Sequence, residues 1–600
     1  MKKIILFLLF IGFSLTGIAQ TTALYSYAPS SGPVGTLVTV TGYNLTNITN
    51  VAIGGTNAIM ISRTGTRLVA MVMPGAVTGN LVFTTAGGGT MGGSYFPFTV
   101  TPTPAPNIQQ GNKLASSDNT GAAFQGYAVS LSADGNTAIV GGYADDDGMG
   151  AAWIFTRNGE TWSQQGSKLI GTGATGTSIR QGWSVAISAD GNTALVGGIL
   201  ESNTGATWVF VRNGGVWTQQ GSKLVGTNGI GSQQGVSVSL SADGNTALVG
   251  GPTDNNGKGA AWVFVRSGSV WTQQGNKLIG TGNAGDANQG SAVSLSADGN
   301  TAILGGTQDN GGIGAAWIFT RSGSTWTQQG NKLAGTGNVG NSEQGTSVSL
   351  SANGNTAIVG GIGDNNRVGA AWVFVRSGTS WSQQGSKFVG TDASAGVGWE
   401  GRSVSLSADG NTAIVGGTED NGNQGAVWVY TRSGSTWTQK GNKRVGTGGA
   451  GAAAQGNSVS LSADGNTFIS GGWFDAGGIG AAWIFKYASD NANLSALTLS
   501  SGTLSPVFDP ATIAYTASVN NTVSSITVTP AREEVNATIE VQVNSGGYTP
   551  VASGSASGDL ALNVGSNTID IKVTAADGIN VKIYTVTVTR LEEQVITFAA

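Results

Sequence analysis

The sequence of 600 residues contains no cysteine and no histidine. Their absence excludes a disulfide framework, a thiol nucleophile, a Cys or His metal site and a Ser-His-Asp triad. Charged residues make up only 10% of the chain, the formal net charge is −4, and Lys and Arg form no run. Because nucleic-acid binders need a basic surface, we expect no nucleic-acid partner. We also expect no cofactor and no metal.

Long apolar runs are scarce as well. Residues 1–20 combine Lys2 and Lys3 with an apolar stretch and the small residues Gly17 and Ala19, the pattern of a secretory signal peptide. The alternative is an N-terminal membrane anchor. No other stretch reaches the roughly 18 apolar residues of a transmembrane helix. We therefore expect a secreted or bacterial cell-surface protein without a transmembrane segment.

What the sequence has in abundance is glycine, with 99 residues, and an internal repeat. The phrase SADGN, once SANGN, recurs seven times at spacings of 53 to 56 residues. Its third residue is Asp134, Asp190, Asp243, Asp298, Asn353, Asp409 or Asp464. Each unit contains four short runs rich in β-forming residues, separated by Gly, Asp, Asn or Ser, and shows no helical periodicity. Four strands in each of seven units predict a seven-bladed β-propeller over residues 107–487.

The repeat begins with its own last phrase. NIQQGNKL at residues 107–114 matches the end of the other units, whereas the seventh unit stops at AAWIFKY, residues 481–487. We predict that residues 107–114 supply the outer strand of the last blade and close the ring. An open array would instead leave sheet edges bare.

The repeated units, such as QGYAVSLSADGNTAIVGGYADDDGMGAAWIF, resemble FG-GAP repeats, the unit of integrin-α-type propellers, in a bacterial short form. Calcium-loaded FG-GAP repeats carry a loop with several carboxylates, because calcium takes six to eight oxygen ligands. SADGN supplies a single Asp followed by Gly, which is a hairpin-turn sequence. We therefore expect a structural turn and not a calcium site at these seven positions.

Two further β domains flank the repeats. Residues 21–100 contain PSSGPVGT, VTGYNL and IGGT and resemble a TIG/IPT immunoglobulin-like domain. A Pro-rich linker, TPTPAP, follows at residues 101–106. Residues 492–590 contain GTLSP and end in YTVTVTR, and they resemble the bacterial cadherin-like β-sandwich. Residues 591–600 are interpreted as the start of a further domain or a tail. The predicted fold class is all-β throughout.

Thirteen of the sixteen tryptophans belong to the repeat, so we expect them in the core between blades and not in a ligand site. Seven lie in the AAWVF phrase: Trp153, Trp208, Trp262, Trp317, Trp372, Trp428 and Trp483. Six lie in the WTQQG phrase: Trp162, Trp217, Trp271, Trp326, Trp381 and Trp437. The acidic triplet Asp145-Asp146-Asp147 is expected to be a solvated turn, with a cation site as the alternative.

The long variable loops are expected on one face of the propeller, where loops on a rigid scaffold usually carry binding. The residue before Gly in each QGxSV phrase is Gln in six of the repeats and Glu400 in the remaining one. These seven side chains are predicted to surround the central channel of the propeller. Residues that break the repeat near this face suit contacts to a sugar or a peptide; the alternative is neutral variation in exposed loops. The candidate ligand-binding residues are Tyr127, Arg180, Trp183, Trp399, Glu400, Arg402, Trp473 and Phe474.

These features predict a monomeric, non-enzymatic binding or adhesion scaffold that recognises an extracellular glycan or protein. No catalytic residue is assigned. One alternative is a propeller carbohydrate-active enzyme, a hydrolase or lyase, with Glu400 as an acid. Glycoside hydrolysis usually needs a second carboxylate about 5–10 Å away, and the sequence offers no clear partner. Another alternative is a structural surface-layer component without a defined ligand.

Overall fold

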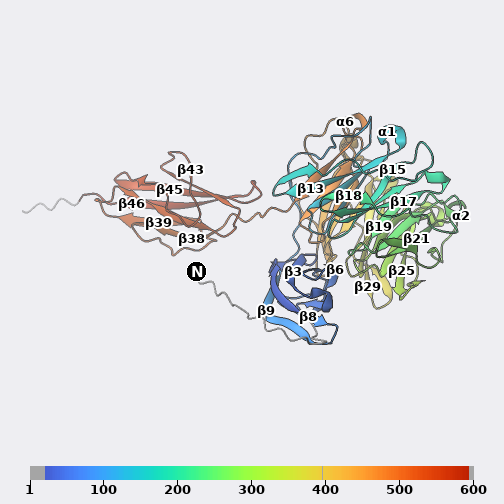
Figure 1. Ribbon diagram of the computed structural model, residues 1–600. Helices are drawn as coiled ribbons and strands as arrows, with labels where there is room; N and C mark the ends of the chain where they lie inside the picture. The colour runs from blue at the N-terminus through green and yellow to red at the C-terminus, as the bar shows by residue number, and fades with distance from the viewer. Residues whose placement is uncertain (1–20, 395, 594–600) are drawn as a thin grey trace, which may run out of the picture. The chain divides into compact units, whose positions relative to one another are not determined.

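The computed structural model describes residues 21–394 and 396–593. The predicted signal peptide and the last seven residues lie outside this range. The chain divides into two compact units. One contains the N-terminal domain and Gln109–Ile484, and the other contains Pro106–Ile108 and the chain from Phe485 onwards. The described residues form short strands with a few single helical turns (Figure 1).

The N-terminal domain consists of two β-sheets with orders β1-β3-β7-β6 and β2-β9-β8-β4-β5. Alternate residues of its strands are buried, including Val38, Val40 and Phe83, as expected for a sandwich whose sheets each have one solvated face. Its elements are β1 (Ala23–Ala28), β2 (Ser31–Gly32), β3 (Leu37–Tyr43), η1 (Leu45–Asn47), β4 (Ile48–Ile53), β5 (Thr56–Asn57), β6 (Ile59–Arg63), β7 (Arg67–Met71), β8 (Gly79–Thr85) and β9 (Thr90–Val100).

The repeats form seven four-stranded antiparallel sheets, here called blades 1 to 7, in a β-propeller. Blades 1 to 3 are β11 (Ala128–Leu131), β12 (Thr137–Gly142), β13 (Ala151–Asn158), β14 (Thr161–Gln164); β15 (Gln181–Ile187), β16 (Thr193–Gly198), β17 (Ala206–Asn213), β18 (Val216–Gln219); and β19 (Ser237–Leu240), β20 (Thr246–Gly251), β21 (Ala260–Ser267), β22 (Val270–Gln273). Blades 4 to 6 are β23 (Gln289–Leu295), β24 (Thr301–Gly306), β25 (Ala315–Ser322), β26 (Thr325–Gln328); β27 (Ser347–Leu350), β28 (Thr356–Gly361), β29 (Ala370–Ser377), β30 (Ser380–Gln383); and β31 (Glu400–Leu406), β32 (Thr412–Gly417), β33 (Ala426–Ser433), β34 (Thr436–Gln439). Blade 7 has the order β10-β37-β36-β35, from β10 (Ile108–Gln109), β35 (Gln455–Leu461), β36 (Thr467–Gly472) and β37 (Ala481–Lys486).

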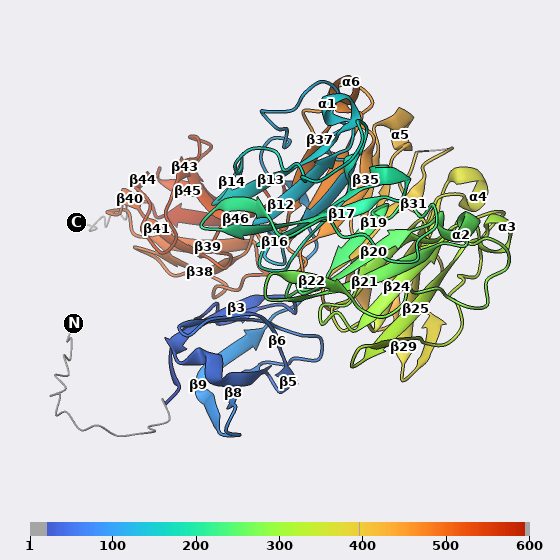
Figure 2. The same ribbon diagram turned by 45° about the vertical axis from the view of Figure 1, so that its right-hand side comes forward.

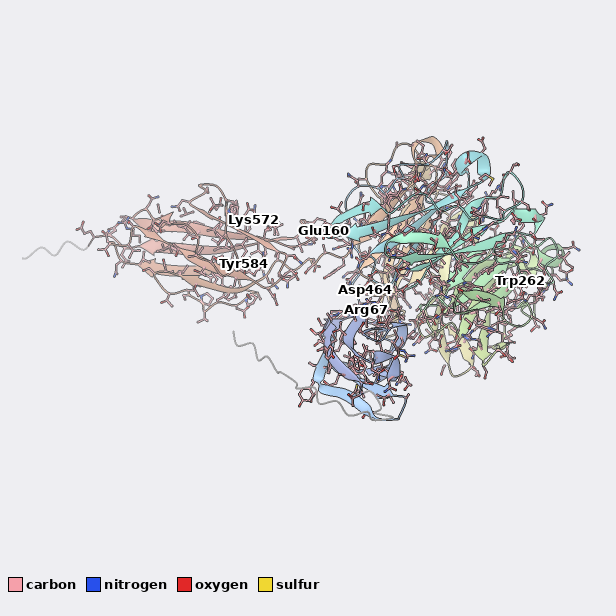
Figure 3. The ribbon with its side chains drawn as sticks, viewed as in Figure 1. Arg67, Glu160, Trp262, Asp464, Lys572 and Tyr584 are labelled. Carbon is pink, nitrogen blue, oxygen red and sulfur yellow. The ribbon has the colours of Figure 1, made fainter. Side chains whose placement is uncertain are left out.

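The two middle strands of each blade are buried on both faces. All six residues of β20 and the first five of β21 are buried, because neighbouring blades cover both sides of the sheet. The tryptophan of the AAWVF phrase is fully buried in all seven blades, as Trp262 is in blade 3 (Figure 3). The expectation that these seven tryptophans are core residues is confirmed.

The outer tryptophans are half-buried and connect neighbouring blades. The indole N–H of Trp217 donates to Gln165 of the preceding blade at 3.0 Å, and the Arg212 guanidinium lies 5.4 Å from the Trp217 ring centre. The other five WTQQG tryptophans donate to the corresponding Gln in the same way. They are therefore used in blade-to-blade contacts.

The outer strand of blade 7 comes from before blade 1. The N–H of Gln110 donates to the carbonyl of Ile484 at 2.8 Å. Leu114 and Ala482 exchange backbone hydrogen bonds of 2.7 and 3.0 Å. The Lys113 ammonium forms an ion pair with the buried Asp475. Residues 107–114 thus occupy in blade 7 the place that the QQGNKL phrase occupies in every other blade.

The SADGN turns, which connect the first and second strands of each blade, form a ring of their own. The N–H of each alanine donates to the carbonyl of the next alanine at 2.9 to 3.0 Å, and Ala463 of blade 7 donates to Ala133 of blade 1. The Asp side chain of six turns, and Asn353 in the turn of blade 5, already accept hydrogen bonds within the turn. Asp134, for example, accepts hydrogen bonds from the Ser132 hydroxyl and from the Asn136 backbone and side chain.

The C-terminal domain consists of sheets with orders β38-β41, β39-β46-β45-β42-β43 and β40-β44. Tyr584 is fully buried in its core, and its hydroxyl donates to the carbonyl of Pro510 at 2.9 Å (Figure 3). Its strands are β38 (Leu494–Leu499), β39 (Ala514–Val519), β40 (Ser525–Ile526), β41 (Val528–Arg532), β42 (Thr538–Val543), β43 (Thr549–Pro550), β44 (Leu560–Ala561), β45 (Gly565–Thr574) and β46 (Val581–Arg590).

Candidate functional site

The loops between the second and third strands each begin with a buried acid that fixes their position. In six blades a helical turn starts there: α1 (Asp145–Gly148), α2 (Asp254–Gly257), α3 (Asp309–Gly312), α4 (Asp364–Arg367), α5 (Asp420–Asn423) and α6 (Asp475–Gly478). Blade 2 has η2 (Glu201–Asn203). These turns lie along one edge of the propeller, which we call the loop face (Figure 2).

Each of these acids forms an ion pair with the lysine of the QQGNKL phrase in its own blade. The pairs are Lys168–Asp145, Lys223–Glu201, Lys277–Asp254, Lys332–Asp309, Lys387–Asp364, Lys443–Asp420 and Lys113–Asp475. The same carboxylates accept a backbone N–H from the loop between blades, as Asp254 does from Ile230 at 2.9 Å. One carboxylate therefore holds three segments together and makes the loop face rigid.

This finding corrects the expectation for the acidic triplet. Asp146 and Asp147 are exposed, but Asp145 is fully buried and paired with Lys168 at 2.6 Å. Sequence reasoning missed all seven pairs. A signal was present, since one acid and one lysine recur at fixed places in every repeat.

The glutamine that precedes Gly in QGxSV does not line the channel. All six glutamines are buried, and in five blades the side-chain amide bonds to the backbone of a single glycine in the loop between blades. Gln181, for example, accepts from the Gly171 N–H at 2.6 Å and donates to the Gly171 carbonyl at 3.0 Å. The predicted ring of amides around the channel is therefore wrong, because these side chains secure the loops.

Glu400 is the exception in this buried ring. Its Oε2 accepts the Gly390 N–H at 2.7 Å, but its Oε1 is buried and has no hydrogen-bond partner. Burial raises the pKa of Glu400 to about 8, and the nearby carboxylates of Asp420 and Asp392 act in the same direction. Glu400 is therefore not exposed at the mouth of the channel, as the sequence had suggested, but lies beneath the surface.

The mouth of the channel is instead lined by the residue that follows Gly in QGxSV. These seven side chains surround a cavity of about 350 Å³: Tyr127, Trp183, Val236, Ser291, Thr346, Arg402 and Asn457. Arg402 donates from Nε to Asn457 Oδ1 at 3.1 Å, and Asn457 donates to the Tyr127 carbonyl at 2.7 Å. Burial raises the pKa of Tyr127, and the adjacent Arg402 guanidinium opposes that rise.

Six aromatic side chains from blades 2, 1 and 7 form one continuous cluster on the loop face. Neighbouring ring centres lie 4.6 to 5.4 Å apart. The members are Trp183, Tyr127, Tyr143, Phe124, Trp473 and Phe474. The Arg180 guanidinium lies 5.8 Å from the ring centres of both Tyr143 and Trp183, within the range of a cation–π interaction.

Four members of this cluster, Tyr127, Tyr143, Trp473 and Phe474, form one side of a pocket of about 470 Å³, which we call the aromatic pocket. Trp399 and Arg402 of blade 6 complete it, with polar groups from Thr418, Glu419 and other residues. Its complete lining is Tyr127, Tyr143, Trp399, Arg402, Thr418, Glu419, Asn423, Ala452, Ala454, Asn457, Trp473 and Phe474. A concave, largely aromatic surface with a few polar groups is typical of a small-ligand site.

The structure brings together most of the candidate residues. Five of the eight line the aromatic pocket: Tyr127, Trp399, Arg402, Trp473 and Phe474. Trp183 lines the adjacent channel mouth, and Arg180 packs on its ring. Glu400 lines neither cavity. Sequence reasoning missed Tyr143, which follows the same Gly-Gly pair as Trp473 and could have been found by aligning the blades.

Two bulky members of this face have a strained backbone. Phe124 has φ 56° and Trp399 has φ 54°, in the left-handed region that large side chains rarely adopt. The corresponding residues of the other five blades have φ values of 50° to 60° as well, so this conformation belongs to the repeat and does not distinguish the site. The indole N–H of Trp399 is also buried without a hydrogen-bond partner.

Neither a membrane-spanning helix nor a cluster of metal ligands is found among the described residues. Among residues 21–394 and 396–593, no helix is long and apolar enough to cross a membrane. Within the same ranges, no group of three or more acidic side chains is placed to hold a metal ion.

Two segments match known domain families. Residues 23–100 match the IPT/TIG domain, and residues 494–591 match the Cadherin-like beta sandwich domain. The two resemblances inferred from the sequence are thereby confirmed for the flanking domains. A protein of Evansella cellulosilytica named "Putative membrane protein" is 40% identical over 105 residues, which is 18% of this chain and 15% of that protein. The chain thus matches only a small part of that relative's length.

Solved structures of low similarity also align with the chain. The periplasmic gluconolactonase of Pseudomonas aeruginosa aligns over 66% of this chain and 96% of its own, with 14% identity and a TM-score of 0.37. An auxiliary nutrient binding protein of Bacteroides thetaiotaomicron aligns over 78% and 99%, with 11% identity and a TM-score of 0.31. The Swd1 β-propeller domain of Myceliophteria thermophila aligns over 63% and 99%, with 12% identity and a TM-score of 0.39.

Proposed function

We propose that this protein is a non-enzymatic binding scaffold that acts outside the cell and recognises a glycan through the aromatic pocket. One observation carries the proposal. Aromatic residues that break the repeat, spread along the chain from Tyr127 to Phe474, meet around a single pocket. Residues that recur in every blade form packing contacts. The residues that differ between blades are therefore the candidates for contact with a ligand.

The chemistry of the pocket favours a saccharide over a peptide. Sugar rings have apolar C–H faces that can pack on Trp399, Trp473 and Tyr127. Their hydroxyl groups need donors and acceptors in pairs, and Arg402 and Glu419 supply both kinds at the same pocket. An extended peptide would be expected to form backbone hydrogen bonds with an exposed strand edge. The pocket is instead described by its side chains, five of which are aromatic.

The pocket offers little support for the enzyme alternative. Glu419 is the one carboxylate that lines it among the described residues, and glycoside hydrolysis usually employs two. Glu400, the acid that the sequence had offered for this role, is buried with its oxygens below the cavity surface. We therefore assign binding without turnover.

A glycan array probed with the full chain tests this function, with variants compared in solution. Trp399→Ala and Trp473→Ala remove aromatic surface from the pocket, and each should weaken binding about 30-fold, as loss of a central aromatic contact does. The matched controls are Asn288→Ala and Thr307→Ala, at the corresponding positions of blade 4, and they should leave the affinity unchanged.

Three results would contradict the proposal. Wild-type protein that binds no glycan would refute it directly. Equal losses in the blade 6–7 variants and the blade 4 controls would show that the aromatic pocket is not the site. Turnover of a bound glycan would replace the binding scaffold with the enzyme alternative.

A further inference from the structure

The channel mouth is a well with a wall on every side. All seven inner strands contribute to it, each with the residue that follows Gly in QGxSV and the next two residues. In blade 4, for example, these are Ser291, Ala292 and Val293. Since a strand rises about 3.3 Å per residue, the well descends about 6–7 Å below its rim. A straight chain could lie across such a well but could enter it only by an end or a short branch.

Below the rim, five blades contribute a serine to the wall of the well, and each of these hydroxyls is already bonded to the neighbouring blade; the layer beneath them is apolar. Seven valines, one from each blade, form a ring around the axis: Val129, Val185, Val238, Val293, Val348, Val404 and Val459. They are only 6–8% exposed, so little of their surface is accessible even from the channel. The ring favours a methyl group over a hydroxyl, because a hydroxyl there would lose its hydrogen bonds to water without replacing them.

The rim of the well is uneven. Tyr127 and Trp183 lie side by side with ring centres 4.7 Å apart, and Arg402 and Asn457 continue the rim on the blade 6 and 7 side. Blades 4 and 5, across the seven-membered ring from Tyr127, contribute only Ser291 and Thr346. The small side chains leave room for a ring-sized group against the aromatic side.

The well and the aromatic pocket share three residues, Tyr127, Arg402 and Asn457. The two cavities are therefore adjoining parts of one site, with volumes of about 350 and 470 Å³. A ligand that filled both would extend from the loops of blades 6 and 7 to the axis of the propeller.

We infer that the protein recognises the end of a glycan chain: the terminal sugar enters the well, and the next sugar lies in the aromatic pocket. The terminal sugar carries a methyl-bearing substituent, such as an acetamido group or the methyl of a 6-deoxy sugar, which rests on the valine ring. Its ring packs against Tyr127 and Trp183, and its hydroxyls face Arg402 and Asn457. This inference rests on the proposed glycan-binding function and specifies the ligand of that site.

The first test fills the well and leaves the aromatic pocket unchanged. Ser291→Phe places a large ring on the side opposite Tyr127, and blades 1 and 2 show that the repeat accepts aromatic side chains at this position. We expect at least tenfold weaker glycan binding, with thermal unfolding unchanged. Thr307→Phe, which adds the same ring to the loop face of blade 4 outside both cavities, is the control and should bind within twofold of wild type. Wild-type affinity in Ser291→Phe would overturn the inference.

The second test reads the chain end directly. The probe is an array that presents each terminal sugar on several different internal chains, including pairs that differ only by a terminal N-acetyl or 6-deoxy group. The bound glycans should share a terminal sugar regardless of the internal chain. The methyl-bearing member of each pair should bind about fourfold more tightly, the value of one buried methyl-sized group.

The outcomes separate this inference from the proposed function. Binding that follows an internal repeat and is lost in Trp473→Ala but kept in Ser291→Phe overturns end recognition while the glycan-binding function stands. Preference for the unsubstituted member of each pair also overturns it. Absence of any glycan binding by wild type removes both.

Discussion

Blades 6, 7, 1 and 2 place seven aromatic side chains at positions of the loop face where blades 3, 4 and 5 place none. The aromatic residues are Trp399, Trp473, Phe474, Phe124, Tyr127, Tyr143 and Trp183. The corresponding residues of blade 4 are Asn288, Ser291, Thr307 and Gln308. Below these positions the blades are alike, with the same lysine–acid pairs and, except at Glu400, the same buried glutamines. The residues that we propose to bind a ligand are thus separable from the scaffold, since they lie on one side of an otherwise uniform ring.

The most severe way to break this comparison is to remove the strand that blade 7 takes from the N-terminal side. Deletion of residues 101–115 removes Lys113 and leaves Asp475 buried and unpaired, which alone costs about 3–5 kcal/mol. It also exposes the apolar edge of β37, so we expect aggregation and loss of glycan binding. Thermal unfolding followed by tryptophan fluorescence reports on the propeller alone, because all sixteen tryptophans lie between residues 107 and 487.

Deletion of residues 21–100 provides the control for this experiment. It removes the N-terminal domain but no repeat phrase, so the propeller should unfold at nearly the wild-type temperature. Equal unfolding temperatures for the two deletions would show that residues 107–114 contribute nothing to the stability of blade 7.

The lysine–acid pairs give a second test of the comparison. They should contribute equally to the free energy of unfolding in the blades with aromatic side chains and in those without them. Lys277→Ala in blade 3 and Lys443→Ala in blade 6 each leave a fully buried aspartate without its partner. We expect both to lower the free energy of unfolding by about 3 kcal/mol. Chemical denaturation gives this number. A loss confined to one of the two variants would contradict a uniform scaffold.

Glu400→Gln tests the one buried position at which blade 6 departs from the others. Gln can donate to Gly390 as the glutamines of five other blades donate to their glycine, so the variant should be more stable by about 1–3 kcal/mol at pH 8. Folding raises the pKa of Glu400 from 4.5 to about 8. The protonated acid therefore stabilises the fold fully below pH 4.5, and this contribution is lost as the pH rises to about 8.

The difference between Glu400→Gln and wild type should accordingly grow from pH 4.5 to pH 8 and then level off. Denaturation at four or five pH values measures it. A variant that is less stable than wild type throughout, or a difference that does not change with pH, would contradict a protonated Glu400.

The smallest effect is expected from addition of the calcium chelator EDTA. The seven turns make the same hydrogen bonds on both sides of the ring: six carboxylates, and the Asn353 side-chain oxygen in blade 5, accept hydrogen bonds within the turn. Addition of EDTA should therefore leave the unfolding temperature nearly constant. A single site at 100 times its dissociation constant contributes about 2.7 kcal/mol, so occupied calcium sites would reveal themselves by a shift of several degrees.

The sequence was sufficient to predict the blades but not the direction of every side chain. Repeat spacing and apolar runs predict seven sheets of four strands, and the structure has them. The buried glutamines could not be placed, because alternation along a strand fails where the strand bulges. The register shifts between Gln181 and Ser184, and Gly182 has φ 81°, which turns Gln181 away from the channel.

The candidate site was predicted in composition but not in shape. Residues that break the repeat were sufficient to identify Trp399, Arg402 and Trp473, since an exception in a periodic sequence is visible without coordinates. The lysine–acid pairs were not, because the partners lie 22 or 23 residues apart in six blades and 362 apart in blade 7, and each resembles an ordinary surface charge. The pairs stabilise the fold because their acids are buried, and this burial depends on the path of the loops, which the sequence does not give.

The origin of the outer strand of blade 7 also sets an order of events during synthesis. Lys113 precedes its partner Asp475 by 362 residues. At about 5–20 residues per second, a ribosome needs roughly 20 to 70 s to make the intervening chain. During that time blades 1 to 6 can each be completed from local sequence, while residues 107–114 have no strand to join. The ring is therefore finished last at the boundary between its oldest and newest segments, and that boundary lies beside the aromatic pocket.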